Sequence, residues 1–323
     1  MDHVNFPYRS SSHLNLLHVV NESGAWERHG LRVDYDKEIS RDDAHKLVSS
    51  GEIEFASGNH VSTYSARARG DNWVYLGQTI SKNHLSLITR PDSGISNLAD
   101  IRHRKFASKG RHSMLNDWLY LKQHGFDIDK DDVEFLRYGS AAIDPALRNL
   151  GKVDAVATGS ADACFVSQPA REFAERRGLK AIDIEVQPMI LFSTISTSLP
   201  FAQKNPDIIT RMLKGMLEGI AFFKTEREKT IDILMKHRAD DGEMDRVAAS
   251  KVYDEIAASL EPKLYPTMDA IFNVYEEAKR QYKDSDKVHP LALWDFHFLR
   301  EIDDSGFIDS LYKGKAAAGA PGK

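Results

Sequence analysis

Two stretches of the chain repeat the same order of apolar and polar positions. Residues 47–60 read Leu-Val-Ser-Ser-Gly-Glu-Ile-Glu-Phe-Ala-Ser-Gly-Asn-His, and residues 147–160 read Leu-Arg-Asn-Leu-Gly-Lys-Val-Asp-Ala-Val-Ala-Thr-Gly-Ser. In each stretch a helix-like segment meets a glycine, which predicts that the helix ends there. The alternation of apolar and acidic residues that follows predicts a short strand leading into a loop of small residues. We therefore expect two related lobes, each carrying such a loop.

The remaining pattern alternates strand-like and helix-like segments as far as Pro200 and is helical after it. Helices are expected at residues 206–229, 241–260 and 267–283. This order predicts an α/β fold with two lobes, residues 1–90 plus 195–323 and residues 91–194. We expect a ligand cleft between the lobes and a helical C-terminal region packed on the first lobe.

Composition narrows the class of protein. The 323 residues are 41% hydrophobic and 28% charged, with a formal net charge of −5, so no global basic surface favours nucleic acid. The richest apolar run, residues 208–223, is interrupted by Arg211, Lys214 and Glu218, which predicts a buried amphipathic helix and no membrane insertion. The single cysteine, Cys164, excludes an internal disulfide and is expected as a buried residue on a helix.

The expected location is cytoplasmic. The first residues, Met-Asp-His-Val, contain neither a basic region nor the apolar run of a secretory leader. The protein would be periplasmic if a leader had been removed before this point. A homodimer is left open by the sequence.

Five segments occur in an order that resembles a known superfamily. They are Gly-Ala-Trp-Glu-Arg-His-Gly-Leu-Arg-Val at 24–33, Ser-Gly-Glu-Ile-Glu-Phe-Ala at 50–56, Ala-Arg-Gly-Asp at 68–71, Arg-Pro-Asp-Ser-Gly-Ile-Ser-Asn-Leu-Ala-Asp-Ile at 90–101 and Gly-Lys-Val-Asp-Ala at 151–155. In these segments the chain resembles the type II periplasmic-binding-protein superfamily, specifically its sulfonate/taurine-binding and thiamine-pyrimidine-synthase branch. The resemblance runs from residue 3 to about residue 310 and implies the two-lobed fold. Because the branch contains both transport receptors and intracellular enzymes, the fold alone does not decide the function.

The candidate site residues come from the strand-end loops, because ligands in open α/β sheets lie at the carboxyl ends of strands. The substrate-binding candidates are Ser12, His13, Gly58, Asn59, His84, Gly110, Arg111, Gly159 and Ser160, and the catalytic candidates are His60 and His112. The four histidines among these candidates (His13, His60, His84 and His112) fall on separate loops that the fold would bring together. A guanidinium such as that of Arg111 can hold a carboxylate or sulfonate through two hydrogen bonds. Each histidine taken alone also fits an ordinary surface or capping position.

Two functions follow from the resemblance. The first is a cytoplasmic lyase of decarboxylase type acting on a small aromatic or heteroaromatic acid, with Arg111 and Asn59 holding the anion. His60 or His112 would donate the proton, because imidazole titrates near neutrality. The branch's pyrimidine synthase has a lysine where this chain has Ala56, and its aryl sulfinate desulfinase has a first-loop cysteine where this chain has serines and a histidine. The dihydroxyphthalate decarboxylase comparison needs neither group. The alternative is an ABC-transporter-type solute-binding protein for a sulfonate, carboxylate or pyrimidine-like ligand.

We expect no cofactor and no resident metal. The sequence has no His-x-x-x-His or Cys-x-x-Cys pair, and the phosphate-binding and dinucleotide-binding glycine motifs are absent. Three histidines from separate loops could still bind zinc, which stays open as an alternative. The expected partner is therefore a small organic anion.

Overall fold

The computed structural model describes residues 1–108, 111–127, 130, 132–137, 145–167, 170–238 and 245–314. Within these ranges the side chains of residues 111–116, 137, 145–150 and 238 are not described. The chain divides into two units: unit 1 contains Met1–Lys82 and Pro188–Lys323, and unit 2 contains Asn83–Gln187. Both boundaries come earlier in the chain than the sequence suggested, because the strand Ser86–Thr89 pairs with strands of unit 2 and the strand Gln187–Ser198 lies in a sheet of unit 1.

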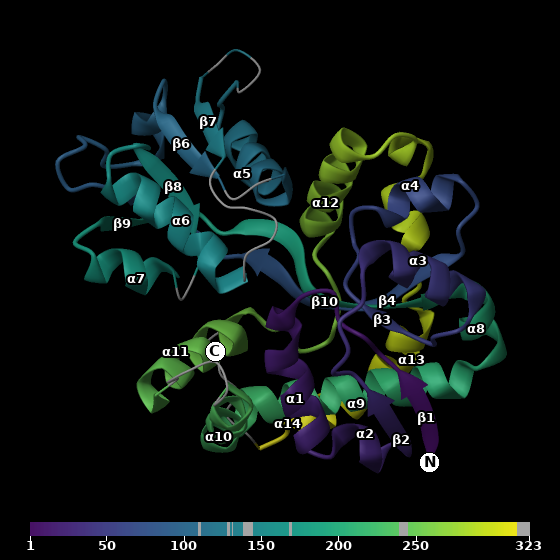
Figure 1. Ribbon diagram of the computed structural model, residues 1–323. Coiled ribbons are helices and arrows are strands. Elements are labelled where there is room, and N and C mark those ends of the chain that lie inside the picture. Colours follow the sequence, from purple (N-terminus) through teal and green to yellow (C-terminus); the bar gives the residue numbers. More distant parts are fainter. Residues whose placement is uncertain are drawn as a thin grey trace. The chain divides into compact units, whose positions relative to one another are not determined.

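Unit 1 contains two small sheets surrounded by helices (Figure 1). Strand β1 (Asp2–Asn5) pairs in parallel with β2 (Leu31–Asp34), and the second sheet has the order β3-β10-β4. The strands of the second sheet are β3 (Ala56–Ser57), β4 (Trp73–Asn83) and β10 (Gln187–Ser198). The helices of unit 1 are η1 (Ser11–His13), α1 (Leu14–Glu22), α2 (Ala25–Arg28), α3 (Arg41–Ser50), α4 (Thr63–Ala68), α8 (Leu199–Lys204), α9 (Pro206–Thr225), α10 (Arg227–Arg238), α11 (Arg246–Ser259), α12 (Met268–Gln281), η5 (Ser285–Lys287), η6 (Pro290–Leu293), α13 (His297–Asp304) and α14 (Phe307–Tyr312).

Unit 2 is a five-stranded sheet with helices, in the order β7-β6-β8-β5-β9. Strands β7, β6 and β8 are parallel, and β5 is antiparallel to both β8 and β9. Its elements are β5 (Ser86–Thr89), η2 (Leu98–Ile101), β6 (Lys105–Ser108), α5 (Arg111–Gln123), β7 (Glu134–Arg137), α6 (Pro145–Ala157), β8 (Ala163–Val166), α7 (Ala170–Arg176) and β9 (Lys180–Asp183).

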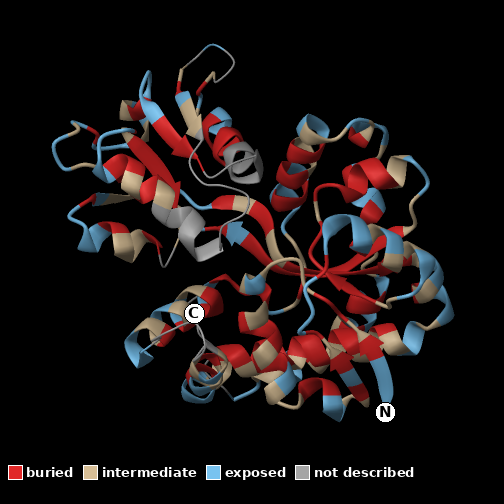
Figure 2. Cartoon of the chain, viewed as in Figure 1, coloured by how far each residue is buried: buried red, intermediate tan, exposed pale blue. Residues whose placement is uncertain are grey.

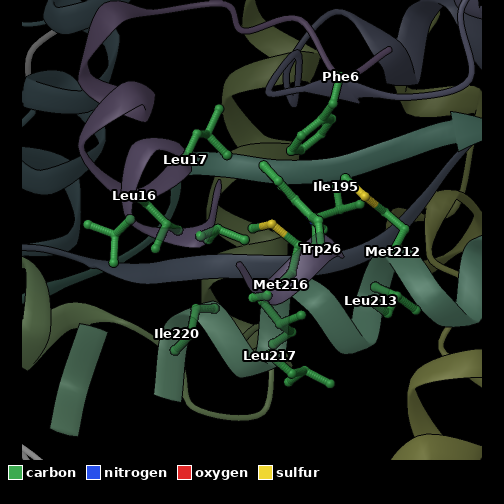
Figure 3. Close-up of a cluster of buried hydrophobic side chains, with 14 of the residues drawn as sticks. Phe6, Leu16, Leu17, Trp26, Ile195, Met212, Leu213, Met216, Leu217 and Ile220 are labelled. Carbon is green, nitrogen blue, oxygen red and sulfur yellow. The ribbon is translucent and has the colours of Figure 1, made fainter. Parts of the chain in front are cut away.

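Helix α9 organises the core of unit 1, as the amphipathic pattern of residues 208–223 predicts. Figure 3 shows Met212, Leu213, Met216, Leu217 and Ile220 of α9 gathered with Trp26 and the leucines of α1. Helix α9 approaches Trp26 and Val20 so closely that two of its positions require glycine. A Cβ on Gly215 would lie 2.4 Å from Cδ1 of Trp26, and a Cβ on Gly219 would lie 2.6 Å from Cγ2 of Val20. The C-terminal helices therefore pack on the first lobe, as expected.

The second copy of the repeated pattern does not form the predicted strand. Residues 153–157 belong to helix α6, and the strand that follows is β8, which carries the buried Cys164. The expectations of a strand at residues 153–158 and of Cys164 on a helix are therefore wrong. The sequence Val-Asp-Ala-Val-Ala fits both periods, since Val153 and Val156 are three residues apart and are both fully buried on one helix face.

Because this strand begins later than predicted, two candidate site residues lie at a different place in the fold. Gly159 (φ +77°) and Ser160 lie in the turn between α6 and β8, and both are exposed. Because β6 and β8 are parallel, this turn lies at their amino ends, opposite to the edge where β6 ends at Ser108. The prediction that Gly159 and Ser160 follow the carboxyl end of a strand is wrong, because Gly159 terminates a helix instead.

Candidate functional site

The candidate site of unit 1 is built on residues 57–60, which follow β3 and are called here the β3 turn. Strand β3 pairs with β10 through Ala56 and Ser57, and the N–H of Gly58 donates to the carbonyl of Thr194 at 3.0 Å. Gly58 (φ +101°) and Asn59 (φ +71°) both have left-handed backbone. Glycine and asparagine tolerate this conformation better than other residues, so the Ser-Gly-Asn-His sequence makes a sharp turn here.

His13 lies against the β3 turn. It ends the short helix η1, its side chain is nearly fully buried, and its Nδ1 is hydrogen-bonded to Oγ of Ser57 at 2.9 Å. A Cβ on Gly58 would lie 3.0 Å from Cε1 of His13 and 3.1 Å from two side-chain carbons of Arg9, so only glycine fits at this position without displacement. Burial, followed by the nearby charge of Arg9, lowers the pKa of His13 to about 3. His13 is therefore a neutral imidazole at pH 7, able to donate or accept one hydrogen bond at each nitrogen according to its tautomer.

The imidazole of His60 is held by a series of side-chain hydrogen bonds from the β3-β10-β4 sheet. Its Nδ1 is 3.3 Å from Oγ1 of Thr194, which in turn donates to Oε1 of Gln78 at 2.6 Å. Gln78 is fully buried and donates to the carbonyls of Ile80, at 2.6 Å, and Leu191. Because each group in this series has a partner, the half-buried imidazole of His60 is oriented from β4 and β10.

The side-chain amide of Asn59 is the polar group of the β3 turn that is available to a ligand. Its backbone carbonyl accepts hydrogen bonds from Thr63 Oγ1 and Tyr75 Oη, each at 3.1 Å. The side chain is only 9% exposed, and its Nδ2 is buried without a hydrogen-bond partner among the described residues. A buried amide donor without a partner costs stability, so such a group calls for an explanation such as a ligand or an ordered water.

An aromatic residue completes this side of the site. Phe192 of β10 stacks on His13, with ring centroids 6.0 Å apart and an interplanar angle of 24°. Phe192, Thr194 and Gln78 were not among the sequence candidates. The apolar and polar alternation of β10 and β4 predicted only strands, and nothing in it marks which strand residue faces a ligand.

The sequence candidates therefore separate into groups. Five of them come together in unit 1: Ser12, His13, Gly58, Asn59 and His60. Ser12 is half-buried, and its Oγ is 2.9 Å from Oγ of Ser10. Unit 2 contains His84, which is exposed in the link between β4 and β5.

The structure does not describe the side chains of the candidates at residues 110–112. Gly110 lies outside the described residues, and Arg111 and His112 open helix α5 with side chains that are not described. His13 and His60 both lie at the β3 turn of unit 1, and the convergence of His13, His60, His84 and His112 on one ligand remains a prediction.

The described residues show neither a metal cluster nor a membrane-spanning helix. No group of three or more His, Cys, Asp or Glu side chains is placed there to hold a metal ion. No described helix is both long enough and apolar enough to cross a bilayer.

With this geometry in view, the class of protein follows. The fold is that of the periplasmic-binding proteins, with a mixed α/β architecture and the helical C-terminal region on the first unit. The chain belongs to the NMT1/THI5-like family, which matches residues 12–229. The expected superfamily and branch are confirmed by this match and by the relatives below.

Three relatives illustrate the range of the branch. A curated 4-amino-5-hydroxymethyl-2-methylpyrimidine phosphate synthase of Schizosaccharomyces pombe is 27% identical over 139 residues, which is 43% of this chain and only 39% of that protein's length. The periplasmic aliphatic sulphonate-binding protein SsuA of Escherichia coli has 17% identity and a TM-score of 0.63, covering 87% of this chain and 86% of that one. The desulfurization enzyme DszB, in complex with biphenyl-2-sulfinic acid, has 16% identity and a TM-score of 0.63, covering 94% of this chain and all of that one. At these identities the structures show the fold alone.

Proposed function

We propose that this protein binds a small organic anion, a sulfonate or a carboxylate, at the β3 turn of unit 1. The observation that carries the proposal is the Asn59 amide, which is nine-tenths buried in a left-handed turn with an unpartnered Nδ2 donor. An acceptor oxygen of a ligand would satisfy that donor, and a hydrogen bond to a charged acceptor is stronger than one between neutral groups. Structural relatives that are sulfonate-binding proteins support this ligand class.

The ligand would be recognised on unit 1 by hydrogen bonds rather than by a histidine cation. His13 is neutral at pH 7 because burial lowers its pKa to about 3. The guanidinium of Arg9, which is also near His13, is oriented by the hydrogen bond that it donates to the carbonyl of Ile39. Neutral donors in a desolvated setting hold sulfonates and carboxylates without the cost of burying a second free charge. The protein in this role is a solute-binding protein, and a periplasmic location would accompany it.

The test is isothermal titration with a panel of benzenesulfonate, methanesulfonate, benzoate and an aminopyrimidine. Asn59→Asp keeps the size of the side chain and its tolerance of left-handed backbone, but it replaces a donor with a negative charge. We expect anion affinity to fall roughly 10- to 100-fold, the equivalent of one hydrogen bond to a charged group at about 1.5–3 kcal/mol.

Asn205→Asp is the matched control. It adds the same charge to the same unit at the residue before α9, and it likewise replaces an Nδ2 donor, which here bonds the carbonyl of Phe201 at 3.2 Å. The control should leave affinity unchanged. The proposal is wrong if no member of the panel binds the wild-type protein at millimolar concentration, or if both variants bind as the wild type does.

A lyase acting on the same anion is the second candidate. One observation favours it: Thr194 and Gln78 orient the imidazole of His60, as a proton donor requires. In that case the protein would release carbon dioxide from an aromatic acid, and a cytoplasmic location would accompany it. His60→Gln would abolish turnover while leaving affinity within about tenfold, since the loss falls on the chemical step. A purified protein that binds aromatic acids and transforms none of them would exclude the lyase.

A further inference from the structure

Phe192 has an unfavourable backbone conformation in the middle of strand β10. Its φ is +60°, in the left-handed region that residues with a β-carbon rarely enter and that bulky side chains enter least. Conformations of this kind persist only where the surrounding structure imposes them, and they cluster at ligand sites. The residue therefore calls for a reason beyond strand formation.

Two side chains of the neighbouring strand β4 fix this conformation. Gln78, fully buried, donates its Nε2 to the carbonyl of Leu191, on one side of Phe192. Thr79, also fully buried, donates its hydroxyl to the carbonyl of Ser193 at 2.9 Å, on the other side. The backbone is thus held on both sides of Phe192, and the direction of its ring is set by the sheet.

The consequence is a pair of flat rings beside the β3 turn. The ring of Phe192 stacks on His13, with centroids 6.0 Å apart, and His13 is itself fixed by Ser57 and crowded by Gly58. His13 is almost fully covered, whereas Phe192 is only half-buried as a residue and also packs against the core of unit 1. Asn59 presents its amide on the same turn.

We infer that Phe192 determines the ligand class, and that the anion bound at the β3 turn carries a planar aromatic or heteroaromatic ring packed against Phe192. The inference rests on the proposed function, since it names the ring of the ligand whose anionic group takes the Asn59 donor. Aromatic contacts add about 0.5–1.5 kcal/mol beyond the burial of their area, and a saturated ring of the same size gains only the burial. The site should therefore distinguish planar from puckered rings of equal charge.

The experiment compares two matched ligand pairs by titration calorimetry: benzenesulfonate with cyclohexanesulfonate, and benzoate with cyclohexanecarboxylate. Within each pair the charge and the ring size are the same, so the ratio of the two dissociation constants isolates the aromatic preference. We expect the wild-type protein to favour the aromatic member by roughly 3- to 10-fold.

Three variants assign that preference to a residue. Phe192→Leu should bring the ratio to within about twofold, because an apolar side chain remains but the ring is gone. Phe192→Tyr keeps a ring and should keep the preference. Phe222→Leu is the control, since Phe222 is another half-buried phenylalanine packed at the edge of the same core, on α9, and its replacement should not change the ratio.

The outcomes separate the two claims. Equal affinities within each pair for the wild-type protein, or a preference that survives Phe192→Leu, would overturn the assignment of Phe192 while leaving anion binding in place. Failure of all four ring ligands to bind would overturn this inference, and the proposed function would fall with it only if methanesulfonate also failed to bind. Urea unfolding of each variant checks that a change in the ratio comes from folded protein.

Discussion

Replacing Gly58 by alanine should damage both stability and ligand binding, and Gly70→Ala provides a matched comparison. Gly58 (φ +101°) and Gly70 (φ +95°) have almost the same backbone conformation, so alanine at either position costs about 1–2 kcal/mol for left-handed strain. At Gly70 a Cβ would meet no atom of the described residues within 4 Å, whereas at Gly58 it would lie 3.0 Å from His13 and 3.1 Å from Arg9. Displacing packed side chains adds about 1–3 kcal/mol. The expected losses are therefore about 2–5 kcal/mol for Gly58→Ala and about 1–2 kcal/mol for Gly70→Ala.

The assay is urea unfolding followed by tryptophan fluorescence, with anion affinity measured on the same preparations. Three of the four tryptophans, Trp26, Trp73 and Trp294, are in unit 1 and report on its unfolding. Gly58→Ala should also weaken binding by at least roughly tenfold, since a misplaced contact of an ångström has effects of that order or larger. Gly70→Ala should bind as the wild type does. Equal losses of stability with unchanged affinity in both variants would refute the reasoning.

Two further predictions concern the core and the dependence on pH. Gly219→Ala should destabilise unit 1 by about 1–3 kcal/mol, because its Cβ would lie 2.6–2.8 Å from Val20. On α6, a Cβ on Gly151 would meet no described atom within 4 Å, so Gly151→Ala should stabilise by about 0.5–1 kcal/mol. Urea midpoints check both variants, and equal effects would contradict the packing argument. The pKa of His18 is lowered to about 4 by burial and by the stacked ring of His237 at 3.6 Å. Because the unfolded chain takes up this proton near pH 6.5 and the folded chain only near pH 4, His18 should lower stability as the pH falls between these values. The slope contributed is at most about 1.4 kcal/mol per pH unit, and the contribution levels off below pH 4. A wild-type profile no steeper there than that of His18→Phe would count against it.

The architecture was predictable because its strongest signals are long and periodic. The helices expected at residues 206–229, 241–260 and 267–283 correspond to α9 with α10, to α11 and to α12. The β3 turn was also predictable, because consecutive Ser-Gly-Asn residues favour a left-handed turn after an apolar strand. Strand β3 itself is only two residues long, since Ile53 and Phe55 lie outside it.

The errors of the sequence analysis have one physical origin: a short sequence pattern is compatible with more than one local structure, and contacts with distant residues decide between them. The alternating apolar residues from Val153 predict a strand, but the segment is helical, and its Val153 and Val156 are buried together on one helix face. Phe192 was missed because its conformation is imposed from β4 by Gln78 and Thr79, more than a hundred residues away. No local sequence pattern carries that information.

The central claim is that the β3 turn and His13 form the ligand site, and histidine NMR tests it directly. In a protein labelled with ¹⁵N at histidine, with signals assigned by single His→Gln variants, benzenesulfonate is titrated to saturation. The account predicts that the signals of His13 and His60 shift with one saturable dose response, that His18 and His237 do not shift, and that His13 stays neutral down to about pH 4 because its pKa is about 3. Signals of His13 and His60 that stay unchanged at saturation, or a His13 that titrates near pH 6.5, would contradict it.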